Sequence, residues 1–253
     1  MSAIPAAFVL GLCLGIGGSP CSAAEPGMRN VYIKMTPGKK AVLDRVWRDS
    51  RNVPTPRFAG LIDGKHPAVA RIDVEGDGGA LYHGSGTLIA ASGSTAIVLT
   101  NWHVIRDAEG KCWARFPDGF RSEATVLKID KTWDLAALVI DRPKTRPVRL
   151  ARSVPKIGDP LTVAGYGGGT YRQSSGRLLQ FCAPGMTEPE DILEITTGAR
   201  SGDSGGPIFA QDGTLAGVLF GSISGTTNGS HIGRVRMFLE SLIGNTTYVS
   251  YRG

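Results

Sequence analysis

Residues 198–207 of this chain read Gly198-Ala199-Arg200-Ser201-Gly202-Asp203-Ser204-Gly205-Gly206-Pro207. A serine flanked by glycines and followed by a proline predicts a tight, irregular turn, with the Ser204 side chain outward and nearby backbone N–H groups free to converge. An acyl-transfer nucleophile needs this arrangement, because N–H donors must meet the oxyanion that forms beside it. Ser204 is therefore a candidate nucleophile.

A serine hydroxyl is a weak nucleophile at neutral pH, so it needs a histidine to take its proton and a carboxylate to orient that histidine. The chain supplies one good candidate for each. His103 ends the largely apolar run Val98-Leu99-Thr100-Asn101-Trp102-His103, and Asp134 begins Asp134-Leu135-Ala136-Ala137-Leu138-Val139-Ile140. The three candidates follow in the order His103, Asp134, Ser204.

The three segments resemble those of the trypsin/chymotrypsin-like serine peptidases. Thr-Asn-x-His-Val around His103 and Asp-Leu-Ala-x-Leu-x-Ile from Asp134 are most similar to the bacterial HtrA-type branch. The segment around Ser204 instead has the trypsin form, with Asp203 where HtrA proteins usually have Asn. The short tail after residue 243 leaves no room for the PDZ domain of full HtrA proteins, which argues against their regulated, oligomeric behaviour.

This resemblance implies an all-β fold of two six-stranded antiparallel Greek-key barrels with the active site between them. It implies a serine endopeptidase acting through an acyl-enzyme, with polypeptide substrates and no cofactor. Ser204 would attack the scissile carbonyl, His103 would carry its proton to the leaving amine, and Asp134 would fix the imidazole tautomer. The backbone N–H groups of Gly202 and Ser204 would form the oxyanion hole.

The resemblance also indicates the substrate-binding residues. Gly198 would lie at the base of the primary pocket, where it offers no carboxylate to hold Lys or Arg. Leu219-Phe220-Gly221 would pair with the substrate backbone and form a pocket wall. We therefore expect cleavage after uncharged side chains, aliphatic or aromatic.

Asp203 needs a partner, because in trypsin-like zymogens the matching aspartate pairs with a new amino terminus. No Ile/Val-Val/Ile-Gly-Gly sequence precedes Ala68 that could supply one. Either Asp203 pairs with another group, of which Arg200 is the nearest candidate, or it is hydrogen-bonded to backbone. We expect activity without proteolytic activation beyond removal of a leader.

Alternating apolar residues predict strands throughout the peptidase domain, which we place at residues 61–253. We place the first barrel at about 67–141, with one strand over 122–129, the second at about 149–230, and a C-terminal helix at about 231–243. Tyr166-Gly167-Gly168-Gly169 lacks the residues of a phosphate-binding loop and predicts a flexible loop.

The first sixty residues divide into two segments. Residues 1–24 are uncharged, largely apolar and end in Ser22-Ala23-Ala24, which predicts a secretory signal peptide and a secreted or periplasmic protein. An uncleaved leader that anchors the protein to a membrane is the alternative, because no Lys or Arg precedes the apolar stretch. Residues 25–60 are expected to form a basic arm with a short helix from Thr36. A solvated lead-in to the domain is favoured, and electrostatic contact with an anionic cell envelope or an acidic partner is the alternative.

Other chemistries find little support. The net charge of +6 comes mostly from the basic arm, so nucleic-acid binding is not expected. His66, His83 and His231 have no second ligand at metal-binding spacing. Cys112 and Cys182 could form a disulfide or remain free thiols.

Two alternatives to a peptidase stay open. A catalytically silent protein of the same fold could bind extended peptides by strand addition. A serine esterase of the α/β-hydrolase type would share the Gly-x-Ser-x-Gly pattern, but Pro207 and a strand-like run follow Ser204 where that fold needs a helix.

Overall fold

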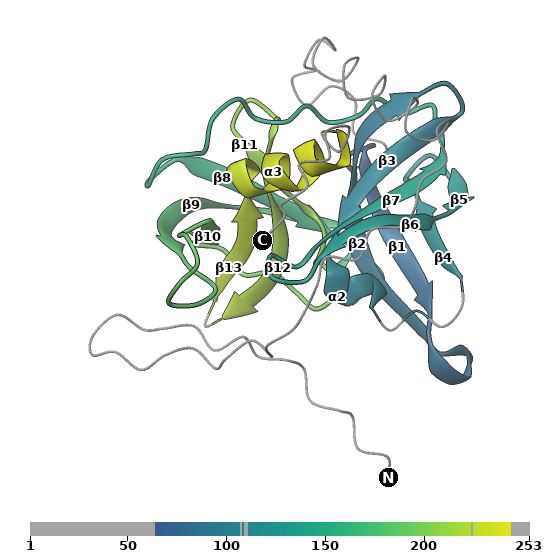
Figure 1. The fold of residues 1–253 in the computed structure, drawn as a ribbon, viewed down its shortest axis with the longest axis horizontal. Helices are drawn as coiled ribbons and strands as arrows, with labels where there is room; N and C mark the ends of the chain where they lie inside the picture. The colour runs from purple at the N-terminus through teal and green to yellow at the C-terminus, as the bar shows by residue number, and fades with distance from the viewer. Residues whose placement is uncertain (1–63, 107, 109–110, 224, 244–253) are drawn as a thin grey trace, which may run out of the picture.

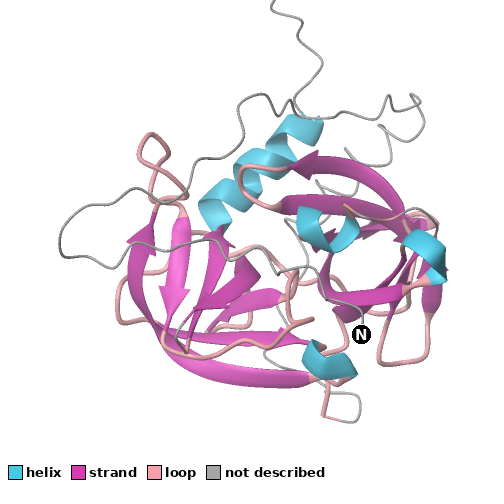
Figure 2. Ribbon diagram, turned by 90° about the horizontal axis from the view of Figure 1, so that it is seen from below, coloured by secondary structure: helices cyan, strands magenta, loops and turns pink. Residues whose placement is uncertain are grey.

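The computed structural model describes residues 64–106, 108, 111–223 and 225–243. The predicted signal peptide, basic arm and short N-terminal helix lie outside these residues. The described part is mostly β: two sheets of antiparallel strands lie side by side, with one long helix, α3 (Ile232–Ile243), near the end of the chain (Figure 1). Figure 2 shows that the remaining helical segments are single turns. None of the described helices is both long enough and apolar enough to span a bilayer.

The first sheet has seven strands, in the order β5-β4-β1-β2-β3-β7-β6. They are β1 (Val69–Glu75), β2 (Leu81–Ser92), β3 (Thr95–Thr100), β4 (Cys112–Arg115), β5 (Arg121–Glu123), β6 (Thr125–Asp130) and β7 (Leu135–Asp141). The single strand expected over 122–129 is divided at Ala124, which gives β5 and β6. The sheet curls so that strands far apart in this order come into contact. The Asp141 amide on β7 donates to the Ser122 hydroxyl on β5 at 2.9 Å.

The second sheet closes into a six-stranded barrel in the order β10-β13-β12-β11-β8-β9. Its strands are β8 (Pro160–Gly165), β9 (Arg172–Cys182), β10 (Ile192–Ile195), β11 (Pro207–Ala210), β12 (Leu215–Ile223) and β13 (Thr226–His231). Buried aliphatic side chains such as Leu178, Leu193 and Ile208 fill its interior. The predicted double-barrel architecture is confirmed; β13 was not predicted as a strand.

Helix α3 packs on β12 and β13 and is also bonded to the first barrel. The buried Lys128 ammonium, on β6, donates to the Phe238 carbonyl at 2.7 Å and lies 4.5 Å from the centre of the Phe238 ring. Burial lowers the pKa of Lys128. Helix α3 therefore fastens the second barrel to the first.

Candidate active site

His103 and Asp134 are brought together at one end of the first barrel. His103 lies in α2 (Trp102–Ile105), the single turn that follows β3. Its Nδ1 is 2.5 Å from Asp134 Oδ2, and its backbone N–H donates to Asp134 Oδ1 at 2.8 Å. The imidazole is 33% exposed and the carboxylate 16%. The ring is thus held from the buried side while part of it stays open to a substrate.

Asp134 has an unusual backbone conformation. Its φ of 50° is the one positive value among the described residues other than glycine. Residues other than glycine seldom adopt this backbone conformation, and it persists only where the surrounding structure stabilises it. The buried Asn101 side-chain amide donates to the Asp134 carbonyl at 2.6 Å, and the Ser230 hydroxyl of the second barrel donates to the neighbouring Trp133 carbonyl at 2.8 Å.

Ser204 lies on the loop before β11, close to Ser85 of β2. The Ser85 amide of β2 donates to the Ser204 carbonyl at 2.8 Å. Gly84 allows this approach, because a Cβ there would lie 2.7 Å from Val104 Cγ1 and 3.2 Å from the Ser204 carbonyl oxygen. The Ser204 hydroxyl donates to the Phe220 carbonyl at 3.3 Å, and within the described chain no hydrogen bond joins it to His103. The structure therefore brings together two of the three candidates directly and places the third on the adjoining loop.

The amides of Gly202 and Ser204 are available to a ligand. Among the hydrogen bonds of the described residues, none uses either N–H group. Gly202 has a φ of 93°, a conformation that glycine adopts without the steric cost of a Cβ. A Cβ at Gly202 would also lie 2.9 Å from His83 Nε2. Both the turn and the space thus require glycine there.

The predicted substrate-binding residues of β12 differ in whether their backbone groups are already paired within the barrel. Leu219 is buried, and its backbone already bonds Gly205 and Gly206 at 2.8 and 2.9 Å. The pairing of β12 with β11 ends at Val218, so from Phe220 onward β12 has only β13 as a described strand partner. Phe220 and Gly221 therefore lie on a free edge, whereas Leu219 belongs to the barrel core.

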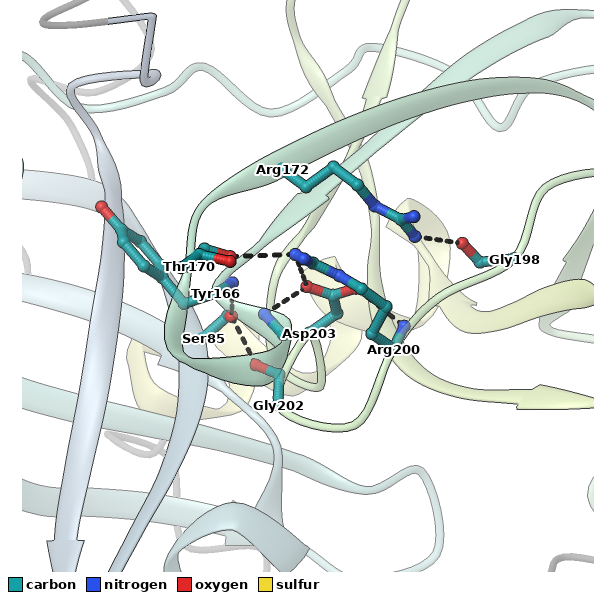
Figure 3. Close-up of polar contacts among 9 residues, drawn as sticks. Ser85, Tyr166, Thr170, Arg172, Gly198, Arg200, Gly202 and Asp203 are labelled. Carbon is teal, nitrogen blue, oxygen red and sulfur yellow. Dashed lines mark hydrogen bonds and ion pairs between the residues drawn. The ribbon is translucent and has the colours of Figure 1, made fainter.

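Gly198 lies next to open space, since a Cβ there would meet only the Gly225 carbonyl, at 3.8 Å. Its own carbonyl accepts a hydrogen bond from the Arg172 guanidinium at 2.8 Å (Figure 3). This contact could not be predicted from the sequence, because Arg172 is 26 residues away from Gly198 along the chain. The charge that the structure places beside Gly198 is positive.

Asp203 is paired with Arg200, the nearest of the partners that the sequence offered, through a contact of 3.2 Å. The turn at residues 166–169 is not the free loop that its glycines suggested. It includes the 3-10 segment η2 (Gly167–Gly169), and the Gly167 amide donates to Asp203 at 2.6 Å. Ser85, which bonds both this turn and the Ser204 loop, carries no sequence motif and could not have been singled out.

The histidines and cysteines outside this site form no metal centre in the part of the chain that is described, where no three metal-ligating side chains gather. His231 contacts Asp191 at 2.8 Å, and the His66 ring lies 4.8 Å from that of Phe209. Cys112 and Cys182 form no disulfide in the described structure, and the Cys182 thiol donates to Glu194 Oε2 at 3.8 Å. Burial, with the nearby Asp73 carboxylate, raises the pKa of Cys112 to about 12.

Solved structures share this architecture. A serine endoprotease from Yersinia pestis aligns with 77% of this chain and 69% of its own, at 24% identity and a TM-score of 0.62. The inactive form of Rv3671c from Mycobacterium tuberculosis H37Rv, crystallised as a mutant, aligns with 78% of this chain and 98% of its own, at 26% identity and a TM-score of 0.59. These similarities extend to both barrels.

Sequence comparison gives the same relatives. The serine protease Rv3671c of Mycobacterium tuberculosis is 31% identical over 134 residues, which cover 49% of this chain and 33% of that protein. The mitochondrial serine protease HTRA2 of Bos taurus is 28% identical over 230 residues, covering 83% and 47%. The chain thus matches between a third and a half of the length of these curated relatives. A family model described as a trypsin-like peptidase domain matches residues 84–218, more than half of the chain, and the protein therefore belongs to the trypsin-like peptidase family, with HtrA-type serine proteases among its relatives.

Proposed function

We propose that this protein is a serine endopeptidase that hydrolyses peptide bonds through an acyl-enzyme intermediate. The observation that carries the proposal is the double contact between His103 and Asp134, made beside a loop on which the amides of Gly202 and Ser204 have no internal acceptor. Relatives such as the DegP-like protein of Chlamydia pneumoniae are named as probable periplasmic serine endoproteases. A periplasmic or secreted location is part of the proposal.

In the proposed reaction Asp134 keeps the proton of His103 on Nδ1, so that Nε2 can accept one. The Ser204 hydroxyl turns from the Phe220 carbonyl toward Nε2 and attacks the scissile carbonyl while His103 takes its proton. The imidazolium, stabilised by the Asp134 carboxylate, then protonates the leaving amine. Water hydrolyses the acyl-enzyme by the same proton transfers in reverse.

The amides of Gly202 and Ser204 would stabilise the negative charge that forms on the carbonyl oxygen. Removing one such donor in an enzyme of this kind lowers the rate by about 10²- to 10³-fold. The donors are backbone groups of a loop that hydrogen bonds hold in place, so they would require little reorganisation when the charge appears. This preorganisation would supply a large part of the rate enhancement.

The substrate would lie as an added strand along the free edge of β12 from Phe220 onward. Its side chain before the scissile bond would point toward Gly198. The Arg172 guanidinium beside the Gly198 carbonyl would repel Lys or Arg in that pocket. We therefore propose cleavage after uncharged side chains.

The experiment that tests the proposal is labelling of the purified protein with a fluorophosphonate, followed by intact mass measurement. We expect one adduct per molecule on the wild type and none on Ser204→Ala, with strongly slowed labelling of His103→Ala. Ser201→Ala, which alters an exposed serine of the same loop, is the matched control and should label as the wild type does. A folded wild type that takes no label would contradict an activated serine.

A catalytically silent peptide-binding protein is the second candidate. It is favoured by one observation, the bond from the Ser204 hydroxyl to Phe220 rather than to His103. If it is correct, extended peptides should bind in titration calorimetry without being cut, and Ser204→Ala should bind them as tightly as the wild type.

A further inference from the structure

We propose that Arg200 is a positioning residue, which acts through Asp203 to hold the Ser204 loop in the conformation that leaves the amides of Gly202 and Ser204 open to a substrate oxygen. This inference rests on the proposed function. In this proposal the Arg200 guanidinium, a cation within the loop itself, determines the orientation of the loop. Three sets of contacts carry it.

The first set surrounds the Asp203 carboxylate, whose side chain is only 6% exposed. It accepts hydrogen bonds from the Gly167 amide at 2.6 Å and from the Arg200 amide at 2.8 Å. The Arg200 guanidinium adds Nε at 3.3 Å and Nη2 at 3.2 Å. A buried carboxylate is tolerated only where it is paired and hydrogen-bonded, and Arg200 is its ion-pair partner among the described residues.

The second set joins the arginine to the turn at residues 166–170. Arg200 Nη2 also donates to the Thr170 carbonyl at 2.9 Å (Figure 3), and the Gly168 amide donates to the Ser201 carbonyl at 3.0 Å. The two segments are in close contact, since a Cβ on Gly167 would lie 2.6 Å from both Arg200 Cβ and Asp203 Oδ1. Arg200 thus closes the turn onto the loop.

The third set fixes the peptide that precedes Ser204. The Gly202 carbonyl accepts from the Ser85 hydroxyl at 2.8 Å, and the Asp203 amide donates to the Arg200 carbonyl at 3.0 Å. Both polar groups of the peptide between Gly202 and Asp203 are therefore occupied. Because this peptide lies between the two open amides, its orientation sets theirs.

Together these contacts make the conformation of the Ser204 loop depend on the ion pair between Arg200 and Asp203, which are three residues apart. If Arg200 loses its charge, the Asp203 carboxylate remains buried without a cation, and the loop should rearrange to expose it to water. If Asp203 also loses its charge, that driving force disappears. The role of Arg200 through Asp203 can therefore be separated from a merely structural role by combining the two substitutions.

The experiment compares Arg200→Gln, Asp203→Asn and the double variant Arg200→Gln/Asp203→Asn with the wild type on a fluorogenic peptide. We expect kcat of Arg200→Gln to fall by about 10- to 100-fold, the order of a weakened oxyanion donor. KM should change by less than about threefold, because ground-state binding is retained. The double variant should recover at least about tenfold of the lost kcat, since the stranded charge is gone. Arg200→Lys should retain most of the activity.

Two comparisons separate this effect from general destabilisation. Arg177→Gln removes an exposed arginine of the same barrel that donates to the Gly158 carbonyl at 2.9 Å, and it should leave kcat unchanged. A peptide boronate, which forms an oxyanion-like adduct, should lose affinity for Arg200→Gln by the same factor as kcat. Equal kcat in the wild type and Arg200→Gln, or losses that add in the double variant, would overturn the proposal.

Hydrogen exchange keeps the inference testable apart from catalysis. Peptides covering 198–206 and 165–171 should exchange faster in Arg200→Gln than in the wild type and return toward wild-type protection in the double variant. Unchanged protection in Arg200→Gln would contradict the proposal even if the wild type took no fluorophosphonate. Failure of that labelling would instead overturn the proposed function.

Discussion

Two of the atoms that Asp134 presents meet two different groups of His103: Oδ2 lies 2.5 Å from the ring Nδ1, and Oδ1 accepts the backbone N–H at 2.8 Å. The carboxylate therefore fixes both the position of the residue and the rotation of its ring. It also selects the tautomer, because an acceptor at Nδ1 requires the proton there.

Asp134→Asn should lower kcat by about 10³- to 10⁴-fold, because an amide nitrogen facing Nδ1 favours the wrong tautomer. The shape of the side chain is kept, so the melting temperature should change little. Asp141→Asn, at the exposed far end of β7, is the matched control and should leave kcat unchanged. Steady-state kinetics with a fluorogenic peptide would measure both, and a kcat within a few-fold of wild type for Asp134→Asn would contradict the assigned role.

The primary pocket should reject basic residues. A peptide library should show cleavage after uncharged side chains, because Gly198 carries no carboxylate and the Arg172 guanidinium lies beside it. The combined change Gly198→Asp/Arg172→Gln should raise the relative kcat/KM for Lys and Arg substrates by at least about tenfold. Dominant cleavage after Lys or Arg by the unaltered protein would refute this assignment of the pocket.

Acid should destabilise the fold through His66. Burial lowers the pKa of His66 from 6.5 to about 4, and its Nδ1 accepts a hydrogen bond from the Ala68 amide at 3.2 Å. The unfolded chain then binds the proton more readily, so the stabilising contribution is complete above pH 6.5 and is lost as the pH falls toward 4. Between pH 7 and pH 5 this group should cost about 2 kcal/mol of unfolding free energy.

Urea unfolding at the two pH values would measure the effect of His66. In His66→Gln the difference between pH 7 and pH 5 should shrink by about that amount, 2 kcal/mol. The partly exposed neighbour Lys65 provides the control, since Lys65→Gln should leave the pH dependence as it is. An identical pH dependence in wild type and His66→Gln would show that His66 does not stay neutral in the fold.

Cys112 should resist alkylation in the folded protein. Its burial and its pKa of about 12 leave almost no thiolate at pH 8, and the thiolate is the reacting form. After iodoacetamide treatment, peptide mapping should find Cys112 unmodified in the native sample and modified in guanidinium chloride. A cross-linked peptide of Cys112 and Cys182 in a non-reducing digest would contradict the absence of a disulfide between them.

Strands made of continuous apolar runs were predictable, because such runs are typical of a strand that is buried on both faces. The segment that begins β7 at Leu135 and the one that ends β3 at Thr100 are examples. Strand β13 was not, since Thr226-Thr227-Asn228-Gly229-Ser230-His231 has the composition of a turn. In the fold Thr227, Asn228 and Ser230 are buried, and two of them donate to carbonyls of distant loops.

The residues of the candidate site likewise divide into those that the sequence indicated and those that it did not. Motifs indicated His103, Asp134 and Ser204 as candidates, because the proposed catalysis needs a particular residue type at each position. The groups that hold the Ser204 loop were not predictable with the same certainty. Arg200 could be suggested from its place three residues before Asp203, whereas Ser85 and Gly167 come close only through the pairing of β2 with its neighbours and the bend after β8. Tertiary contacts of this kind leave no local pattern.

The contact between Lys128 and Phe238 bears on the order in which the molecule can be completed. The ammonium belongs to the first barrel, and the carbonyl that receives it lies 110 residues further along the chain. A growing polypeptide has therefore synthesised every described strand of both barrels before this acceptor exists. The final packing of the amino-terminal half therefore waits until α3 has been synthesised and has formed.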